Sequence, residues 1–204
     1  YFLTPGTNIS PFDVTMAADA GFDIVLPITN VNPKDVTGIV QDAIFCRPPS
    51  RFNDTGIFIG GRDVHLATDM FQSAKKAMVG PFEVGVFADP NGAYTTSASV
   101  VALVEQVLKE HHNKNLNGCK VSVFGTGPVG TCAAILAAKQ GAKVNICQLL
   151  AEDEQRTVIT FCERYDTNVN WVSAQTNKEK TAEIEDSDVI ICAARAGIRI
   201  LEGH

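Results

Sequence analysis

The sequence predicts an α/β fold in which helices and parallel strands alternate along the chain. Three observations support this prediction. Short apolar runs alternate with amphipathic segments, a polar stretch over residues 111–118 divides the pattern into two series, and a glycine-rich segment follows an apolar run in the second series. Strands joined by helices in this way pair in parallel through right-handed crossovers. We therefore expect two domains, over residues 1–112 and 113–204.

The first series is marked by helix caps and turns. Ser10 can cap a helix that has Pro11 in its first position and ends at Gly21, a combination typical of helix boundaries. A helix over 62–78 carries an apolar stripe that we expect to face the core, made of Leu66, Met70, Ala74 and Ala77. The other expected elements are strands over 23–27, 55–61 and 82–88, a helix opening at 32–33, a turn over 89–92 and a helix over 95–108.

The second series alternates more regularly. We expect strands over residues 120–124, 142–147, 168–172 and 188–193, and helices over 131–140 and 152–165. The glycine-rich segment stands between the first strand and the first helix of this series. This order is typical of a nucleotide-binding domain of the Rossmann type.

The glycine-rich segment Gly-Thr-Gly-Pro-Val-Gly matches the dinucleotide-binding pattern. Gly125 permits the tight turn from strand to helix, Gly127 leaves room for a pyrophosphate, and Gly130 lets the helix pack close to the strand. The N–H groups at the start of the helix attract phosphates. We therefore expect a site for NAD or NADP formed by Gly125, Thr126, Gly127, Pro128, Val129 and Gly130.

The end of the next strand indicates which nucleotide is bound. A carboxylate there binds the ribose 2′-hydroxyl of NAD, whereas a nearby arginine accommodates the 2′-phosphate of NADP. This sequence has Gln148, followed by two leucines. The first acids, Glu152 and Asp153, and the first arginine, Arg156, come later. We expect the site to accept either nucleotide, with Gln148 in contact with it, although a surface position without a ligand is the alternative for this residue.

Small residues follow the last expected strand, at 192–197. A dinucleotide crosses the carboxyl edge of the sheet at this place in the Rossmann fold. We expect Ala193, Ala194 and Gly197 to contact the cofactor; close helix packing is the alternative explanation for their size.

Composition and charge exclude several other classes of protein. Seventeen basic against 23 acidic residues give a net charge of −6, which argues against nucleic-acid binding through a basic face. No apolar run approaches the roughly 18 residues that a membrane span needs, and no signal peptide is visible, so we expect a cytoplasmic protein. The six cysteines form no CxxC pair and no cluster with zinc spacing, so we expect reduced thiols and no metal site.

Several further motifs together resemble one family over nearly the whole chain. They are Ser-Pro-Phe-Asp-Val near the N-terminus, Thr-Asn-Val-Asn-Pro at 29–33, Ile-Phe-Ile-Gly-Gly at 57–61, Gly-Pro-Phe at 80–82, Asp-Pro-Asn-Gly-Ala-Tyr-Thr-Thr at 89–96 and the glycine motif at 125–130. In this order they resemble the NAD(P)-dependent methylene-tetrahydromethanopterin dehydrogenases of bacterial one-carbon metabolism.

The resemblance implies an oxidoreductase that transfers a hydride reversibly from methylene-tetrahydromethanopterin to NAD(P)+ and gives the methenyl form. It also implies an N-terminal pterin-binding domain, an active site between the domains and a homo-oligomer. Some family members also take methylene-tetrahydrofolate. Family members have a longer C-terminal part that completes the nucleotide-binding sheet and supplies a lysine to the active site, so we expect the Rossmann-like domain here to be truncated.

The expected chemistry selects the catalytic candidates. Hydride loss from a methylene bridge between two nitrogens leaves a delocalised cation and releases no proton, so the site needs orientation and negative charge rather than a general base. Asp13 is the first candidate, because the resemblance places an acidic active-site residue here; stabilisation of the helix start is the alternative. Thr95 and Thr96 are the others, and we expect one of them to cap the next helix. Asn30 and Asn91 are candidates for substrate binding, although both are also typical turn residues.

Two other functions stay open at this point. A methylene-tetrahydrofolate or shikimate-type dehydrogenase has the same parts, but a catalytic lysine is expected in its first domain. Lys34, Lys75 and Lys76 all fall in amphipathic helices instead. The second alternative is a non-catalytic, nucleotide-binding relative.

Overall fold

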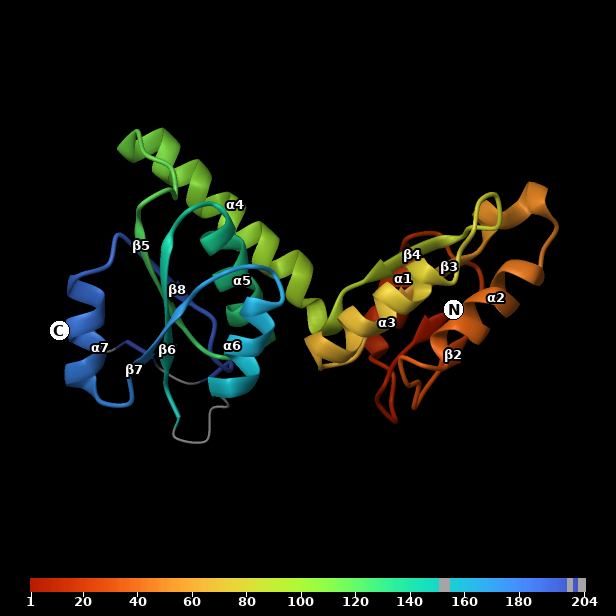
Figure 1. The fold of residues 1–204 in the computed structure, drawn as a ribbon, viewed down its shortest axis with the longest axis horizontal. Helices are drawn as coiled ribbons and strands as arrows, with labels where there is room; N and C mark the ends of the chain where they lie inside the picture. Colours follow the sequence, from red (N-terminus) through yellow and green to blue (C-terminus); the bar gives the residue numbers. More distant parts are fainter. Residues whose placement is uncertain (151–154, 198–199, 202–204) are drawn as a thin grey trace. The chain divides into compact units, whose positions relative to one another are not determined.

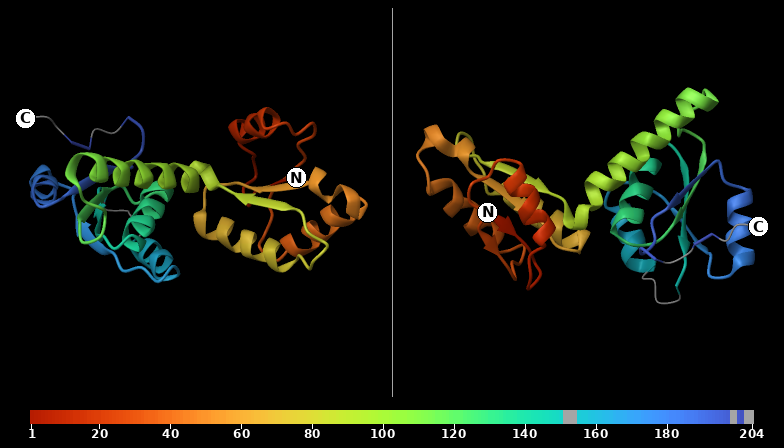
Figure 2. Two further views of the ribbon diagram at one scale, coloured as in Figure 1. Left: turned by 90° about the horizontal axis from the view of Figure 1, so that it is seen from above. Right: turned by 180° about the vertical axis from the view of Figure 1, so that it is seen from behind.

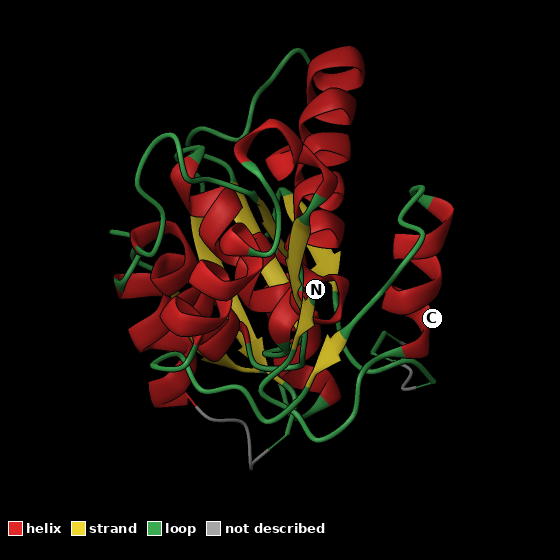
Figure 3. Cartoon of the chain, turned by 90° about the vertical axis from the view of Figure 1, so that its right-hand side faces the viewer, coloured by secondary structure: helices red, strands yellow, loops and turns green. Residues whose placement is uncertain are grey.

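A computed structural model describes residues 1–150, 155–197 and 200–201, and the chain divides into two compact units, Tyr1–Gly92 and Ala93–His204 (Figure 1). Each unit combines a parallel sheet with helices, as the secondary-structure colours show (Figure 3). The α/β class expected from the sequence is therefore confirmed.

The first unit is built on a four-stranded parallel sheet. Its strands are β1 (Phe2–Leu3), β2 (Pro27–Ile28), β3 (Gly56–Ile59) and β4 (Gly85–Ala88), in the spatial order β2-β1-β3-β4. The central strand β1 pairs with β2 on one side and with β3 on the other. The strand order reverses between β1 and β3, and α/β folds bind ligands at the carboxyl edge beside such a reversal.

The two faces of the first sheet are covered unequally. Helices α2 (Val36–Phe45) and α3 (Val64–Lys76) lie on one face, and α1 (Pro11–Asp19) lies on the other (Figure 2, left). Both α2 and α3 contribute fully buried side chains, whereas α1 has no buried residue. The start of α1 is as expected, since Pro11 is its first residue and the Ser10 hydroxyl accepts a hydrogen bond from the backbone N–H of Asp13 at 3.4 Å.

The strand expected over residues 23–27 is placed differently. Only Pro27 and Ile28 pair with the sheet, because their partner strand β1 contributes just two residues, Phe2 and Leu3. Of the apolar residues before Pro27, Leu26 still bonds to the sheet, because its carbonyl oxygen accepts a hydrogen bond from the N–H of Phe2 at 2.9 Å.

Three of the four residues expected in the buried stripe of α3, Met70, Ala74 and Ala77, are buried, and Leu66 is not. Asp63 caps this helix by accepting hydrogen bonds from the backbone of His65 and Leu66 at 2.8 and 3.0 Å. The helix therefore begins at Val64, which is buried, and Leu66 is turned outward and is 37% exposed. The buried residues of α3 are Val64, Ala67, Thr68, Met70 and Ala74.

The second unit contains the other parallel sheet. Its strands are β5 (Lys120–Phe124), β6 (Lys143–Gln148), β7 (Asn170–Ser173) and β8 (Val189–Cys192), in the order β7-β6-β5-β8. In chain order within the unit this is 3-2-1-4, the arrangement of a Rossmann sheet around its switch point. The Rossmann-like class of this unit is thus confirmed, and the switch point lies between β5 and β8.

Helices α5 (Pro128–Lys139) and α6 (Gln155–Glu163) cover one face of this sheet, and α7 (Asn177–Glu185) covers the other (Figure 1). The sequence pattern did not predict α7, because it is strongly polar and buries one residue, Glu183. Its start carries a local signal all the same: Thr176 and Glu179 form a reciprocal capping box.

Helix α4 (Ala93–His112) belongs to the second unit, where it packs against α5. It buries Val101 and Leu108, and the loop after it buries Leu116. The division between the units therefore falls after Gly92, whereas the polar composition of residues 111–118 had suggested a boundary after residue 112. The polar stretch contains the end of α4 and an exposed loop that leads into β5, with Leu116 as its buried residue.

Candidate nucleotide and substrate sites

The glycine-rich turn joins β5 to α5 at the carboxyl edge of the second sheet. Gly125 has φ +126°, a conformation that L side chains rarely adopt. A Cβ on Gly125 would lie 2.7 Å from the carbonyl carbon and oxygen of Ala193, and a Cβ on Gly130 would collide with the carbonyl oxygen of Gly125. Close packing of backbone against backbone therefore requires glycine at both positions.

Gly127 is under no such constraint. It caps α5, and Pro128 occupies the first helical position. A Cβ on Gly127 would meet no atom within 4 Å, so it would enter open space beside the helix N-terminus. The partial positive charge there favours a phosphate. These residues fit the pyrophosphate of a dinucleotide, and the half-buried Thr126 and Val129 complete the turn.

Gln148, the expected ribose contact, is the last residue of β6 and is half-buried. Its side-chain Oε1 accepts a hydrogen bond from Nε1 of Trp171 on β7 at 3.3 Å. The side chain of the next residue, Leu149, packs against the buried cluster of Phe124, Cys147 and Ala174. Glu152 and Asp153, the first acids after the strand, lie outside the described residues.

The small residues after β8 lie beside the glycine turn. The N–H of Ala193 donates to the carbonyl oxygen of Phe124 at 2.8 Å, so β8 and β5 remain paired up to the turn. Ala194 follows directly, and Gly197 adopts φ +86° in an exposed turn. The structure thus brings Ala193 and Ala194 to the glycine motif, while contact of these residues and Gly197 with a cofactor stays a prediction.

Two thiols lie at the carboxyl ends of strands in this unit. Burial raises the pKa of Cys147 to about 12, and burial also raises the pKa of Cys192. Both thiols are therefore protonated at neutral pH and add no negative charge near the phosphate site.

The carboxyl edge of the first sheet gathers polar side chains. Thr4, directly after β1, is 1% exposed, and its hydroxyl accepts a hydrogen bond from the N–H of Gly6 at 3.2 Å. Asp89, directly after β4, is 8% exposed. Burial raises the pKa of Asp13 and the charge of Asp89 raises it further, while a hydrogen bond with Ser10 lowers it. The two carboxylates are therefore electrostatically coupled, and they concentrate negative charge at this edge.

The two asparagine candidates both have left-handed backbone conformations. Asn30, after β2, has φ +55°, and its N–H donates to the carbonyl oxygen of Gly6 at 2.9 Å. Asn91 has φ +54° within the short segment η2 (Pro90–Gly92). Asparagine tolerates this conformation better than most residues. The turn geometry thus accounts for both residues, and a role in substrate binding stays a prediction.

Thr95 and Thr96 are exposed residues in the first turn of α4. Neither caps the helix, as we had expected one of them to do, because α4 already begins at Ala93. The turn at Asp89–Gly92 ends immediately before the helix and leaves no room for a later start. Their proposed catalytic role is not affected by this correction and stays a prediction.

Sequence reasoning missed two residues of these sites. The sequence predicts only a turn at Asp89, and its burial together with its electrostatic effect on Asp13 identifies it as an active-site candidate. Its position directly after an apolar strand was the available signal. For Trp171 the sequence predicts only a place in a strand, because its contact with Gln148 depends on the register of β6 against β7.

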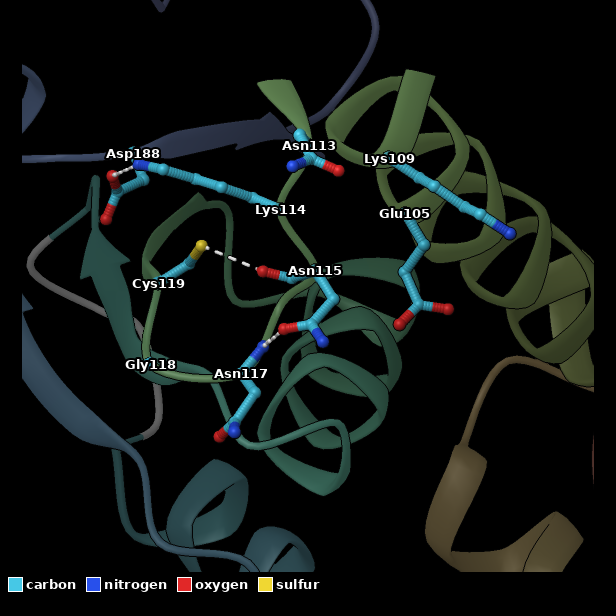
Figure 4. A pocket seen from close by; sticks show the side chains of 9 residues that line it. All are labelled: Glu105, Lys109, Asn113, Lys114, Asn115, Asn117, Gly118, Cys119 and Asp188. Atoms are coloured by element: carbon cyan, nitrogen blue, oxygen red, sulfur yellow. Dashed lines mark hydrogen bonds and ion pairs between the residues drawn. The ribbon is translucent and has the colours of Figure 1, made fainter. Parts of the chain in front are cut away.

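A polar hollow of about 760 Å³ lies at the opposite, amino-terminal side of β5 (Figure 4). It is lined by the end of α4 and the loop that follows, including Lys109 and Asn113, and by Asp188, which forms an ion pair with Lys114 at 3.6 Å. Its charges are mixed, and it is separate from the glycine turn. Among the described residues, no group of His, Cys, Asp and Glu is arranged to hold a metal ion. In the same part of the chain, no helix is both long and apolar enough to cross a membrane.

A parallel-sheet unit with a dinucleotide-type turn, combined with a second α/β unit whose carboxyl edge carries acids, defines the class of two-domain nucleotide-dependent dehydrogenases. Sequence comparison agrees with this class. Residues 11–91 match the family described as "Methylene-tetrahydromethanopterin dehydrogenase, N-terminal", and residues 112–197 match "Alanine dehydrogenase/PNT, C-terminal domain".

Two relatives come from Methylorubrum extorquens. The NAD(P)-dependent methylenetetrahydromethanopterin dehydrogenase is 41% identical over 203 residues, which are 98% of this chain and 68% of the relative. The bifunctional protein MdtA is 31% identical over 94% of this chain and 66% of its own length. The chain therefore belongs to the NAD(P)-dependent methylenetetrahydromethanopterin dehydrogenase family, which confirms the family expected from the motifs.

Solved structures support the fold. Shikimate 5-dehydrogenase from Listeria monocytogenes has a TM-score of 0.54 at 18% identity and aligns with 100% of this chain and 71% of its own. Ornithine carbamoyltransferase from Pyrococcus furiosus also has a TM-score of 0.54, at 15% identity, over 96% of this chain and 59% of its own. At these identities the likeness shows the shared α/β architecture alone.

Proposed function

We propose that this protein catalyses reversible hydride transfer from methylene-tetrahydromethanopterin to NAD(P)+, giving methenyl-tetrahydromethanopterin and NAD(P)H. The observation that carries the proposal is the 41% identity to an enzyme of this name over 98% of the chain. Family membership supplies the enzyme class and the NAD(P) dependence. The methylene carbon loses a hydrogen together with both electrons of the C–H bond, as a hydride. The product is therefore a cation, and no proton is released.

The role of the first unit follows from the charge of this product. Asp13 and Asp89 bring negative charge to the edge where the sheet order reverses, and a carboxylate beside a developing cation lowers the barrier. Asp13 acts in its ionised form, because only the carboxylate stabilises a cation. Asn30 and Asn91 bind the pterin, and Thr95 and Thr96 help to orient the reactants.

The second unit holds the nicotinamide nucleotide, which supplies the hydride acceptor when bound. The turn over 125–130 receives the pyrophosphate, and Gly127 leaves the space that the phosphates occupy. Gln148 lies toward the ribose, and Ala193, Ala194 and Gly197 leave room at the carboxyl edge. We also propose that the enzyme acts in the cytoplasm and that it is a homo-oligomer; the family resemblance implies the oligomer.

The test uses the full reading frame that contains this chain. Absorbance of the reduced nicotinamide is followed with methylene-tetrahydromethanopterin and with methylene-tetrahydrofolate, each with NAD+ and NADP+. We expect turnover with the methanopterin substrate. Turnover only with the folate substrate would replace the proposed substrate. Nucleotide binding without any turnover would favour a non-catalytic relative.

A further inference from the structure

The contact between Gln148 and Trp171 links two neighbouring strands at the nucleotide edge. In the β6–β7 register, Ile146 lies opposite Trp171 and Gln148 lies opposite Ser173. Every second residue of a strand points to the same face of the sheet, so Gln148 shares a face with Ile146 and therefore with Trp171, which lies opposite Ile146. The Trp171 and Gln148 side chains are thus diagonal neighbours on this face. The indole Nε1 and the amide Oε1 are 3.3 Å apart.

This hydrogen bond selects one of the two orientations of the amide. An indole N–H is a donor and has no acceptor, whereas a glutamine amide has an acceptor oxygen at one end and an NH₂ donor at the other. The opposite orientation would set the NH₂ against the indole N–H, donor facing donor. Trp171 therefore holds the oxygen of Gln148 toward itself and turns the Nε2 donor away from itself.

The orientation matters because of where Gln148 lies. It is the last residue of β6, the position at which this type of fold contacts the ribose 2′ group. A carboxylate here accepts from a 2′-hydroxyl and repels a 2′-phosphate. An amide that presents its NH₂ can donate to the oxygen of either group, and more strongly to the charged phosphate.

We infer that Trp171 is a positioning residue that sets nucleotide selectivity by orienting the Gln148 amide, so that the site accepts NAD and NADP and favours the 2′-phosphate. The inference rests on the proposed nucleotide site. In this inference the uncharged pair of Trp171 and Gln148, rather than an arginine, sets the choice between NAD and NADP.

The test measures binding, independently of turnover. Calorimetry with ADP-ribose and with 2′-phospho-ADP-ribose gives two dissociation constants, whose ratio reports the preference for the 2′-phosphate. Trp171→Phe keeps an aromatic ring in the strand and removes the N–H. We expect this variant to bind ADP-ribose with nearly unchanged affinity and to lose about threefold to tenfold of the preference, the size of one net hydrogen bond.

Three further variants distinguish orientation of the amide from a general effect on the strand. Gln148→Leu should remove the preference, and adding Trp171→Phe to it should change the ratio no further, because the indole acts through the amide. Ser173→Ala is the matched control: it lies opposite Gln148 on β7, and its hydroxyl bonds Glu179 at 2.8 Å rather than the amide. It should leave the ratio unchanged.

The possible failures are distinguishable. An unchanged ratio in Trp171→Phe, an equal loss for both ligands, additive effects in the double variant, or a shift in Ser173→Ala would each overturn the inference. Failure of the unaltered protein to bind either ligand would instead overturn the proposed nucleotide site. Because Trp171 is the one tryptophan in the sequence, its emission gives a second readout of binding in the unaltered protein and in Gln148→Leu.

Discussion

The carboxyl edges of the two sheets are filled by different parts of the chain. At the edge of the second sheet backbone meets backbone, since Gly125 and Gly130 lie too close to neighbouring carbonyl groups for any side chain. At the edge of the first sheet side chains fill the space, with Thr4 and Asp89 buried and Asp13 electrostatically coupled to Asp89. The edge of the second sheet, the proposed nucleotide site, therefore depends on the absence of side chains at two glycines, and the edge of the first sheet, the proposed substrate site, depends on polar side chains that are present. We expect added side-chain atoms to disrupt the edge of the second sheet, and removal of charged groups to impair the edge of the first sheet.

The helices that follow the first strand of each sheet also differ in how far they are buried. Helix α5 buries seven of its residues, whereas α1 buries none. The position of α5 is thus fixed by its packing against the sheet. The start of α1 is fixed locally by the cap at Ser10 and by Pro11. We expect substitutions in α5 to cost stability and substitutions in α1 to cost mainly function.

The largest expected effect is that of Gly130→Ala. In an ordinary helix this change is stabilising, but here the added methyl collides with the carbonyl oxygen of Gly125. We expect a loss of about 3 kcal/mol in the free energy of unfolding, measured by urea denaturation. Gly127→Ala is the control, because its methyl enters open space. It should cost about 1 kcal/mol or less, because alanine is a poorer N-cap than glycine, and should weaken nucleotide binding about tenfold. Equal stability of the two variants would contradict the packing argument.

Asp13→Asn should have the next largest effect, on turnover rather than on stability. Loss of a charge that stabilises the transition state should reduce kcat roughly 100-fold, with nucleotide binding preserved. Asp19→Asn, at the exposed end of the same helix, should leave kcat unchanged. An undiminished kcat in Asp13→Asn would remove this residue from the catalytic site.

The pH dependence of kcat tests the coupling between Asp13 and Asp89 at the edge of the first sheet. Because burial and the charge of Asp89 raise the pKa of Asp13, the active carboxylate form is lost as pH falls through a value above its ordinary 3.8. Asp89→Asn should lower the pKa of Asp13 and move the acid limb of kcat to lower pH. An acid limb that stays in place would show that the two carboxylates are not coupled.

Glu183→Gln tests the core of the second unit. Burial disfavours the charged form of Glu183, but hydrogen bonds from Ser122, Asn145 and Lys120 outweigh it and lower its pKa. The carboxylate therefore stabilises the fold above its ordinary pKa of 4.5, and this stability is lost as pH falls through the lowered value. We expect Glu183→Gln to cost about 1–3 kcal/mol at neutral pH and less in acid. Glu185→Gln, exposed on the same helix, is the control, and an equal loss there would refute the buried-network explanation.

The smallest effect is expected at α1. Phe12 is 68% exposed, so Phe12→Ser should change the free energy of unfolding by less than about 0.5 kcal/mol. Thermal unfolding followed by circular dichroism measures this change. A loss of stability as large as that expected for a substitution in the core would show that α1 packs more tightly than its exposure indicates.

Local sequence determined much of the fold, because caps and strand–turn–helix units are made by neighbouring residues. Ser10 and Pro11 fix the start of α1, and β5 occupies the expected residues 120–124. The glycine spacing at 125–130 predicted the turn from strand to helix, since a side chain at Gly125 or Gly130 would collide with neighbouring backbone, while Gly127 leaves open space at the helix start. Sequence motifs also identified the family.

Tertiary structure decided what depends on partners distant in the chain. Helix α7 has little apolar signal because its buried residue is a charged one, matched to Ser122 and Asn145 on other elements. The segment before Pro27 is apolar, yet its pairing is limited by β1. The coupling of Asp13 to Asp89 and the contact of Trp171 with Gln148 arise from chain reversal and strand register. Such contacts follow from the paths of separate segments, and no local pattern in the sequence encodes those paths.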